Sequence, residues 1–214
     1  DLLLPYILTN GRLAEDNLSI RESGNGIPDL LDEARNEVDF FLSIRDGEAY
    51  SQGVTNPSSD WTVMYQAGCT TMAAWANAAN CAMMAEAFRI NGNEELCNYY
   101  KAEAIKAFRF AQKHKESQLD DWQNIGTSSM RGRDFKQMAA AFIYNLTGDR
   151  EWEDIMVEES VVRNGVAPLF AKERNNQYYQ IWGAAAYLTC PQERHYPEYY
   201  ETLVKSVNKQ ADEN

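Results

Sequence analysis

The sequence contains few of the residue patterns that mark common catalytic or metal sites. Its 214 residues include only two histidines, His114 and His195, which lie far apart in the chain. A nucleophilic triad built on either histidine therefore has no support, and we expect structural roles for both. A Gly-rich phosphate loop, a His-Glu-x-x-His motif and an EF-hand pattern are also absent. The sequence accordingly predicts no metal site of these kinds and no cofactor.

Positive charge and long apolar runs are scarce as well. Lys and Arg number 20 against 32 Asp and Glu, which gives a formal net charge of −12 and a pI near 4.6. This excess of negative charge argues against a nucleic-acid backbone or an anionic membrane as a partner. No apolar run approaches the roughly 20 residues that span a bilayer, and no signal peptide opens the chain. A neutral sugar polymer suits this charge, and a cationic sugar would be attracted by it.

The cysteines show no paired spacing such as Cys-x-x-Cys; they are Cys69, Cys81, Cys97 and Cys190. Two of them, Cys81 and Cys97, fall among apolar neighbours in predicted helices, where a free cysteine packs as a small hydrophobic residue. We expect buried free thiols rather than disulfides. Free thiols favour a reducing compartment, but this indication is slight and leaves the localisation unknown.

Helical periodicity recurs along the whole chain, and no segment shows a convincing strand pattern. The length suffices for one domain with a sizeable core, and no shift in composition marks a second, so we expect a single domain over residues 1–214. The predicted helices are Asp1–Ile7, Pro28–Ile44, Gly68–Asn91, Glu94–His114, Asp134–Leu146, Arg150–Glu159, Tyr178–Thr189 and Pro197–Gln210.

Alanine-rich helices alternate with more highly charged ones. The segment Gly68–Asn91 is rich in alanine, whereas Glu94–His114 carries many charged residues. Small side chains allow inner helices to approach one another closely, and charged faces belong outside. The alternation predicts an all-α fold of helical hairpins arranged in a ring.

The stretch Arg21–Ile44, RESGNGIPDLLDEARNEVDFFLSI, reads as a tight loop followed by an amphipathic helix. Gly24 and Gly26 permit backbone angles that are closed to other residues, and Pro28 suits the first helical position. Negative charge is favoured in the first turns, where the acidic residues are Asp29, Asp32 and Glu33.

The longer segment Asp16–Ile44 resembles the sequence that follows the catalytic aspartate motif of glycoside hydrolase family 9, the endoglucanase family. Members typically read D-N-L-N-I-P-E-S-G-N-G-I-P-D-I-L-D-E, and here Arg21 replaces the proline. Two further segments are similar to the family: Cys69–Phe88 resembles its alanine-rich inner helix, and Asp134–Asp154 resembles a later helix and its Thr-Gly-Asp turn.

The resemblance implies a ring of six helical hairpins, of which this chain would supply roughly four, so we expect a partial (α/α) barrel. In relatives, the Asp-Ala-Gly-Asp motif that carries the base lies just upstream of the sequence matching Asp1. The general acid, a Glu in an Asn-Glu pair, lies far downstream. Inverting hydrolysis needs both carboxyl groups, so the resemblance assigns no catalytic residue to this chain.

The carboxylates within the chain do not replace that pair. Besides the acidic first turns described above, the clusters are Asp120–Asp121 and Glu158–Glu159. A catalytic acid needs a pKa raised by burial or by a like charge, which adjacent residues on a surface do not supply by spacing alone. We interpret all of these clusters as helix caps and solvated faces.

A calcium site known from some relatives also lacks its residues here. Those relatives bind calcium through a Ser-Gly-x-x-Asp-Glu run before the later helix. The corresponding positions hold Met130, Arg131, Asp134 and Phe135. Because only Asp134 is retained, we predict that this calcium site is missing.

Aromatic residues make up 12% of the chain and are the best candidates for binding sugar. Tyr and Trp rings stack on the C–H-rich faces of sugars, and their polar edges bond hydroxyl groups. Trp75, Trp152 and Tyr144 lie on helical stripes and are expected in the core. The candidates at loops or helix ends are Tyr50, Trp61, Trp122, Tyr178, Tyr179 and Trp182. In a family loop of the form Gly-Val-Tyr-His-Lys, the tyrosine corresponds to Tyr50, but Ser51 and Gln52 replace the His and Lys.

Two classes of function stay open at this point. One is part of a glycoside hydrolase that acts on β-1,4-linked polysaccharide or oligosaccharide; the other is a non-catalytic helical module that binds carbohydrate or protein. The expected partners are a β-linked saccharide and the remaining parts of the same catalytic domain. Because missing hairpins would leave apolar faces bare, above all at Cys69–Phe88 and in the first segment, we expect the isolated chain to self-associate. The residues expected on the bare face of the first segment are Leu2, Leu3, Leu4, Ile7 and Leu8.

Overall fold

The computed structural model describes residues 2–56, 60, 62–114, 119–125, 128–173 and 176–212, with only the backbone described for 122–125, 128, 172, 173 and 176. The chain forms two compact units, Asp1–Gln118 and Leu119–Asn214. Each unit is described by itself.

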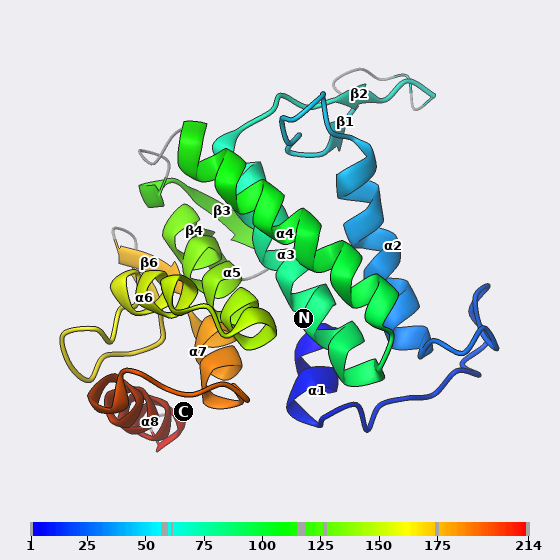
Figure 1. Cartoon of the computed structure of the whole chain (residues 1–214). Helices are drawn as coiled ribbons and strands as arrows, with labels where there is room; N and C mark the ends of the chain where they lie inside the picture. Colours follow the sequence, from blue (N-terminus) through cyan, green and yellow to red (C-terminus); the bar gives the residue numbers. More distant parts are fainter. Residues whose placement is uncertain are drawn as a thin grey trace. The chain divides into compact units, whose positions relative to one another are not determined.

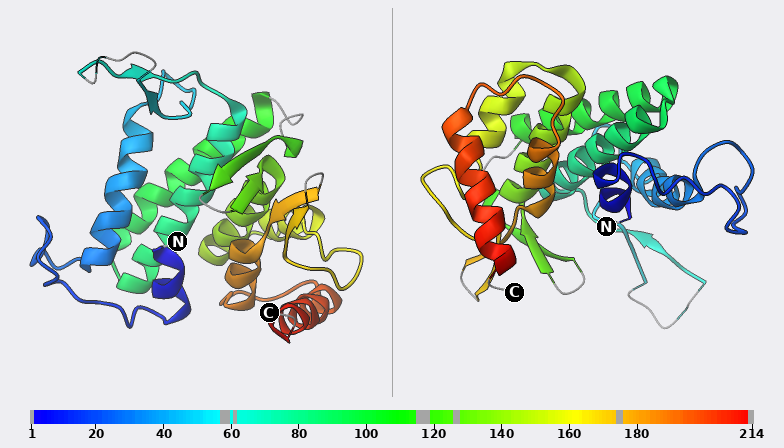
Figure 2. Two further views of the ribbon diagram at one scale, coloured as in Figure 1. Left: turned by 180° about the vertical axis from the view of Figure 1, so that it is seen from behind. Right: turned by 90° about the horizontal axis from the view of Figure 1, so that it is seen from below.

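The first unit is built around a long helical hairpin (Figure 1). Its elements are α1 (Leu3–Leu8), α2 (Asp29–Ser43), β1 (Val54–Thr55), β2 (Tyr65–Gln66), α3 (Thr71–Asn91) and α4 (Glu94–His114). Helices α3 and α4 lie side by side in every view (Figure 2), and α1 and α2 both pack against α3. Local signals mark both ends of α3. The Thr70 hydroxyl accepts a hydrogen bond from Ala73 N at 3.1 Å, and Gly92 ends the helix in the left-handed region with φ +84°.

Helix α3 is buried along nearly its whole length, whereas α4 buries one stripe. Close packing is possible on most sides of α3 because its alanines present little bulk. The buried residues of α4 are Cys97, Tyr100, Ala104, Ala107, Phe108 and Ala111. This difference confirms the predicted roles of an inner and an outer helix, and it also means that the Cys69–Phe88 segment does not present the bare face that the sequence suggested.

The second unit contains two strand hairpins and four helices within its described residues. Its elements are β3 (Trp122–Ile125), β4 (Ser128–Arg131), α5 (Gly132–Thr147), α6 (Arg150–Glu158), β5 (Phe170–Glu173), β6 (Asn176–Tyr179), α7 (Ile181–Leu188) and α8 (Pro197–Asp212). Helix α5 packs against α6 and α7, and strand β4 lies beside β6. Like α3, α5 is buried over most of its length and ends at a glycine with positive φ, Gly148 at +70°.

The predicted helices are present, and their ends shift by at most a few residues. One helix start was assigned to the wrong kind of structure: Tyr178 and Tyr179 were predicted to start a helix but form the end of strand β6, and α7 begins only at Ile181. The expectation of no strand is also wrong, because three antiparallel two-stranded hairpins are present. Adjacent tyrosines favour a strand, and pairing of β6 with β5 places Tyr179 opposite Phe170.

At the start of α2, Pro28 is the residue before the first helical position, with φ −54° and ψ 131°. The carboxylates of Asp29 and Asp32 are buried rather than solvated, which corrects the sequence interpretation. The Asp29 carboxylate accepts hydrogen bonds from Leu18 N and from the Ser23 hydroxyl, and it thereby fastens the preceding loop to the helix.

The cysteines are free, as expected; Cys81, Cys97 and Cys190 are buried and Cys69 is exposed. Burial raises the pKa of the Cys81 and Cys97 thiols, so both stay protonated at neutral pH. Within the described parts of the chain, no helix combines the length and the hydrophobicity needed to cross a membrane.

Candidate functional site

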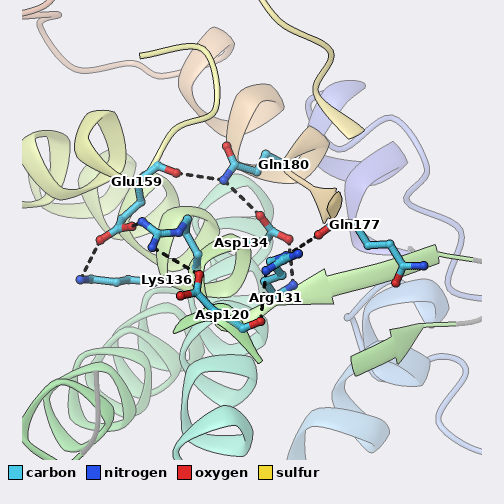
Figure 3. Close-up of polar contacts among 8 residues, drawn as sticks. Asp120, Arg131, Asp134, Lys136, Glu159, Gln177 and Gln180 are labelled. Atoms are coloured by element: carbon cyan, nitrogen blue, oxygen red, sulfur yellow. Dashed lines mark hydrogen bonds and ion pairs between the residues drawn. The ribbon is translucent and has the colours of Figure 1, made fainter. Parts of the chain in front are cut away.

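A polar network surrounds the first turn of α5 in the second unit (Figure 3). We call it the α5 network, and its members are Asp120, Arg131, Arg133, Asp134, Lys136, Glu159, Gln177 and Gln180. The members come from the end of β4 and the start of α5, from the residues just before β3 and just after α6, and from β6 and the residue that follows it. Hydrogen-bonded partners up to 46 residues apart in sequence therefore meet at one helix end.

Asp134 occupies the centre of the α5 network and is 1% exposed. Its carboxylate accepts hydrogen bonds from Arg131 N at 2.8 Å, from Tyr179 N at 2.9 Å and from Gln180 Nε2 at 3.1 Å. The first of these caps the helix, because Asp134 is the third residue of α5. Burial raises the pKa of the Asp134 carboxyl to about 6, although the N–H donors act in the opposite direction.

The Arg131 side chain joins the two strand hairpins. Its Nε donates to the main-chain carbonyl of Gln177 in β6, and its Nη1 donates to the carbonyl of Asp120 at 3.2 Å. A planar guanidinium can donate in two directions at once, so one side chain serves both segments.

Glu159 is the second buried carboxylate of the α5 network, contrary to the expectation of a solvated face. Its oxygens lie 2.9 Å from Lys136 Nζ, which is itself buried, and within hydrogen-bond distance of Arg133. Its main-chain carbonyl accepts a hydrogen bond from Gln180 Nε2 at 3.0 Å. A buried carboxylate requires such partners, because an unpaired charge away from water is costly.

The charges of the α5 network balance. Asp120, Asp134 and Glu159 supply three carboxyl groups, and the three cationic members are Arg131, Arg133 and Lys136. The network therefore carries no net charge, and it joins the strand hairpins to the helices. Among the described residues, no group of three or more His, Cys, Asp or Glu side chains is arranged to hold a metal ion.

The aromatic candidates lie in different surroundings. Tyr50 is 1% exposed in the first unit, with its ring 5.5 Å from that of Phe110 and the Arg45 guanidinium 5.9 Å from its ring centroid. A ring enclosed in this way offers no open face for a sugar. Trp61 lies outside the described residues, and for Trp122 only the backbone, at the start of β3, is described.

The remaining three candidates lie together in the second unit, at the end of β6 and the start of α7. The Tyr179 ring packs 4.5 Å from the Trp182 ring and 5.9 Å from the Phe170 ring. Trp182 is 8% exposed, so it acts mainly as the base of this stack. Tyr178 is half-buried, and its hydroxyl donates to the carbonyl of Pro168 at 3.0 Å. The structure thus brings together Tyr178, Tyr179 and Trp182.

A second polar cluster joins α6 to the segment before α8. The fully buried Glu153 accepts hydrogen bonds from the Tyr187 hydroxyl at 2.6 Å and from His195 N at 3.0 Å, and its other oxygen lies 2.7 Å from His195 Nδ1. Burial, together with the hydrogen bond to Glu153, raises the pKa of Tyr187. This cluster supports the expected structural role of His195. His114 stacks on Phe110 with ring centroids 4.3 Å apart.

The sequence did not identify Arg131, Glu159 and Gln180 as members of a common site. One contact had a local signal. Asp134 lies three residues after Arg131, which is the spacing of a helix N-cap and the third helical residue, whose carboxylate can accept from the N-cap amide. For Glu159 and Gln180 no local pattern was available, because their partners lie 19 or more residues away.

Comparison with known proteins identifies the family. Residues 4–214 match the family described as Glycosyl hydrolase family 9. A comparison with curated proteins finds no significant match.

Solved structures of hydrolases, two of them named as members of family 9, share the fold. A family 9 glycoside hydrolase of Bacteroides ovatus matches with a TM-score of 0.75 and 21% identity, over 99% of this chain and 42% of its own. A metagenome-derived family 9 endoglucanase matches with a TM-score of 0.72 and 22% identity, over 97% of this chain and 40% of its own. A thermostable endoglucanase variant from Alicyclobacillus acidocaldarius matches with a TM-score of 0.70 and 16% identity, over 99% of this chain and 42% of its own.

These matches confirm the predicted class, an all-α segment of a barrel of helical hairpins, and the chain spans about 42% of the length of the structure from Bacteroides ovatus. Because the family match covers almost every residue of the sequence, this chain belongs to glycosyl hydrolase family 9.

Proposed function

We propose that this chain is part of a single catalytic domain that hydrolyses β-1,4-linked polysaccharide or oligosaccharide by inverting acid/base catalysis, with both catalytic carboxyl groups outside residues 1–214. The observation that carries the proposal is the family match over residues 4–214, together with coverage of only 42% of a solved relative. Two of the solved relatives are endoglucanases by name, which favours a β-glucan as the first substrate to test.

The state of the buried carboxylates supports a catalytic pair outside this chain. Inversion requires one carboxyl group that protonates the leaving oxygen and another that activates water on the opposite face of the sugar. Asp134, Glu153 and Glu159 are instead surrounded by N–H donors, a phenol or cations of the fold. Their burial and these partners fit a structural role in holding the fold together.

The aromatic side chains are the proposed contacts to the sugar. We propose that substrate binding draws on five residues of the group identified from the sequence, namely Trp61, Trp122, Tyr178, Tyr179 and Trp182, because the ring of the sixth, Tyr50, is enclosed. Within this group, Tyr179 stacks on Trp182 at the end of β6, and the neighbouring half-buried Tyr178 is held through its hydroxyl by Pro168 O. The buried Tyr50 is better suited to supporting its loop.

The test compares the full-length protein that contains this chain with residues 1–214 alone. Both are incubated with cellohexaose and with chitosan oligomers, and the anomeric configuration of the first products is followed by proton NMR. We expect the full-length protein to release products of inverted configuration and the isolated chain to release none.

Turnover by the isolated chain after stringent purification would contradict the placement of the catalytic carboxyl groups. Retention of configuration by the full-length protein would contradict the inverting mechanism. Sugar binding without any hydrolysis by the full-length protein would favour the alternative, a non-catalytic carbohydrate-binding module.

A further inference from the structure

The backbone of Tyr178 is fixed from both sides by the last residue of β4 and the first turn of α5. The carbonyl of the preceding residue, Gln177, accepts a hydrogen bond from Arg131 Nε. The amide of the following residue, Tyr179, donates to the Asp134 carboxylate at 2.9 Å. Arg131 and Asp134 thus hold the two peptide groups that flank a single aromatic residue.

The side chains of Tyr178 and Tyr179 have different environments, because successive residues of a strand point to opposite faces. The Tyr179 ring packs on Trp182 and Phe170. The Tyr178 ring is on the other face of β6, and its hydroxyl is held by the carbonyl of Pro168 at 3.0 Å. Tyr178 is therefore restrained at its backbone and at the far end of its ring.

The same Arg131 side chain reaches the neighbouring hairpin. Its Nη1 donates to Asp120 O at 3.2 Å, and Gly132 N donates to Asp121 O at 3.0 Å, so the residues before β3 are fixed to the start of α5 as well. Strands β4 and β6 lie side by side. The Arg131 guanidinium consequently sets the position of β6 against that of the β3–β4 hairpin.

We propose that Arg131 is a positioning residue for carbohydrate binding: it fixes the β6 backbone so that Tyr178 is held in the orientation in which its ring stacks on a β-linked sugar. The inference rests on the proposed function. An aromatic residue that is already ordered loses less conformational freedom when it binds, and ordering one flexible side chain on binding weakens affinity about threefold to tenfold.

The experiment uses the full-length protein with cellohexaose as the probe and three variants. Arg131→Ala removes both hydrogen bonds, Arg131→Lys keeps the charge but loses the planar fork, and Arg133→Ala is the matched control. Arg133 is the second arginine of this helix start, and it pairs with Glu159, which keeps Lys136 as a partner in the variant. The readouts are KM and kcat for cellohexaose, the Kd from calorimetric titration, the melting temperature, and hydrogen exchange of the Tyr179 amide.

We expect Arg131→Ala to raise KM and Kd by about threefold to tenfold with kcat within about twofold of wild type. Exchange of the Tyr179 amide should become faster, and Arg131→Lys should show a smaller increase in KM. Arg133→Ala should lower the melting temperature without raising KM.

Equal KM values for Arg131→Ala and Arg133→Ala would overturn the inference, as would a fall in kcat with unchanged KM. An unchanged rate of Tyr179 amide exchange in Arg131→Ala would also overturn it. If the wild type binds cellohexaose but does not hydrolyse it, the proposed function fails, and the Kd values of the same variants still decide the role of Arg131. Absence of any binding by the wild type overturns both.

Discussion

At the scale of single residues, Asp134 combines roles that are usually separate. It caps α5 through Arg131 N, anchors β6 through Tyr179 N, and lies out of contact with water. Its carboxyl pKa of about 6 compares with 3.8 for an unperturbed aspartate, and burial is the main cause. Asp134 is therefore a source of pH-dependent stability.

We predict that Asp134 makes the protein less stable as the pH rises from about 4 to about 6. In this window the folded protein keeps a proton that the unfolded chain has lost, so unfolding releases a proton and its free energy falls as the pH rises. A shift from 3.8 to about 6 corresponds to about 3 kcal/mol. Urea unfolding of wild type and Asp134→Asn at several pH values measures this change.

Between pH 4 and 6, the free energy of unfolding should fall less steeply with rising pH in Asp134→Asn than in the wild type. Loss of hydrogen-bond acceptors should also destabilise the variant by about 1–3 kcal/mol near pH 4. Asp120→Asn, which removes an exposed carboxylate from the same network, controls for the loss of one negative charge. Identical slopes for wild type and Asp134→Asn would refute the prediction.

At the scale of elements, the loop before α2 is organised by carboxylates. The Asp16 side chain accepts hydrogen bonds from Gly24 N at 2.6 Å and from Gly26 N at 2.8 Å. These N–H donors lower the pKa of the Asp16 carboxyl, and the amide of Gly24 has the largest effect. Asn25 Nδ2 donates to Asp32 at 2.9 Å, and so the loop is attached to the helix that follows it.

We predict that Gly26→Val destabilises the protein by about 1–3 kcal/mol because of its backbone angle. Gly26 has φ +87°, and a Cβ at this position would meet no atom within 4 Å, so strain and not a steric clash is the expected cause. Chemical unfolding of the full-length protein measures the loss, and calorimetry with cellohexaose measures binding.

The matched control is Gly68→Val. A Cβ at Gly68 also meets nothing within 4 Å, but the backbone there is not in the left-handed region. We expect a clearly smaller loss of stability in this variant. If Gly26→Val abolished sugar binding at an unchanged melting temperature, the loop would belong to the substrate site and not to the scaffold.

At the scale of the whole molecule, exposed large apolar side chains are concentrated in the first unit. The described residues of this kind are Leu2, Leu8, Leu13, Leu18, Phe40, Val54, Met64, Tyr65, Tyr99 and Val166. All except Val166 belong to the unit Asp1–Gln118. In α1, Leu3 and Ile7 are buried, which corrects the expectation that the whole apolar set of this segment is bare, whereas Leu2 and Leu8 are 51% exposed.

We predict that residues 1–214 alone self-associate through the first unit. Monomeric proteins rarely leave large apolar patches uncovered, and burial stabilises association by about 25 cal/mol per Å². Light scattering over a range of concentrations should show species larger than a monomer. The double variant Leu2→Ser, Leu8→Ser should associate less, whereas Val166→Ser in the second unit should behave as wild type. A stable monomer at high micromolar concentration would contradict the prediction.

The sequence by itself determined the helices and the family. Helix α4 begins and ends at Glu94 and His114, as its periodicity predicted, because the signals for a helix lie within the helix and its caps. The ungapped similarity over Asp16–Ile44 indicated the family that the match over residues 4–214 establishes. Trp75, Trp152 and Tyr144 are buried as their helical positions predicted, because one face of each helix must be covered.

Only the tertiary structure decided which polar residues act together. Asp134 meets Tyr179 across 45 positions of sequence, and Lys136 meets Glu159 across 23. A carboxylate is buried when a distant segment supplies its donors, and no local pattern encodes that segment. The same holds for β6, where pairing with β5 and the hydrogen bonds of Arg131 and Asp134 outweigh the helical pattern that runs from Tyr178 into α7. Local periodicity specifies helices because their hydrogen bonds are local, whereas hairpin pairing and buried charges depend on contacts that form only when the chain has folded.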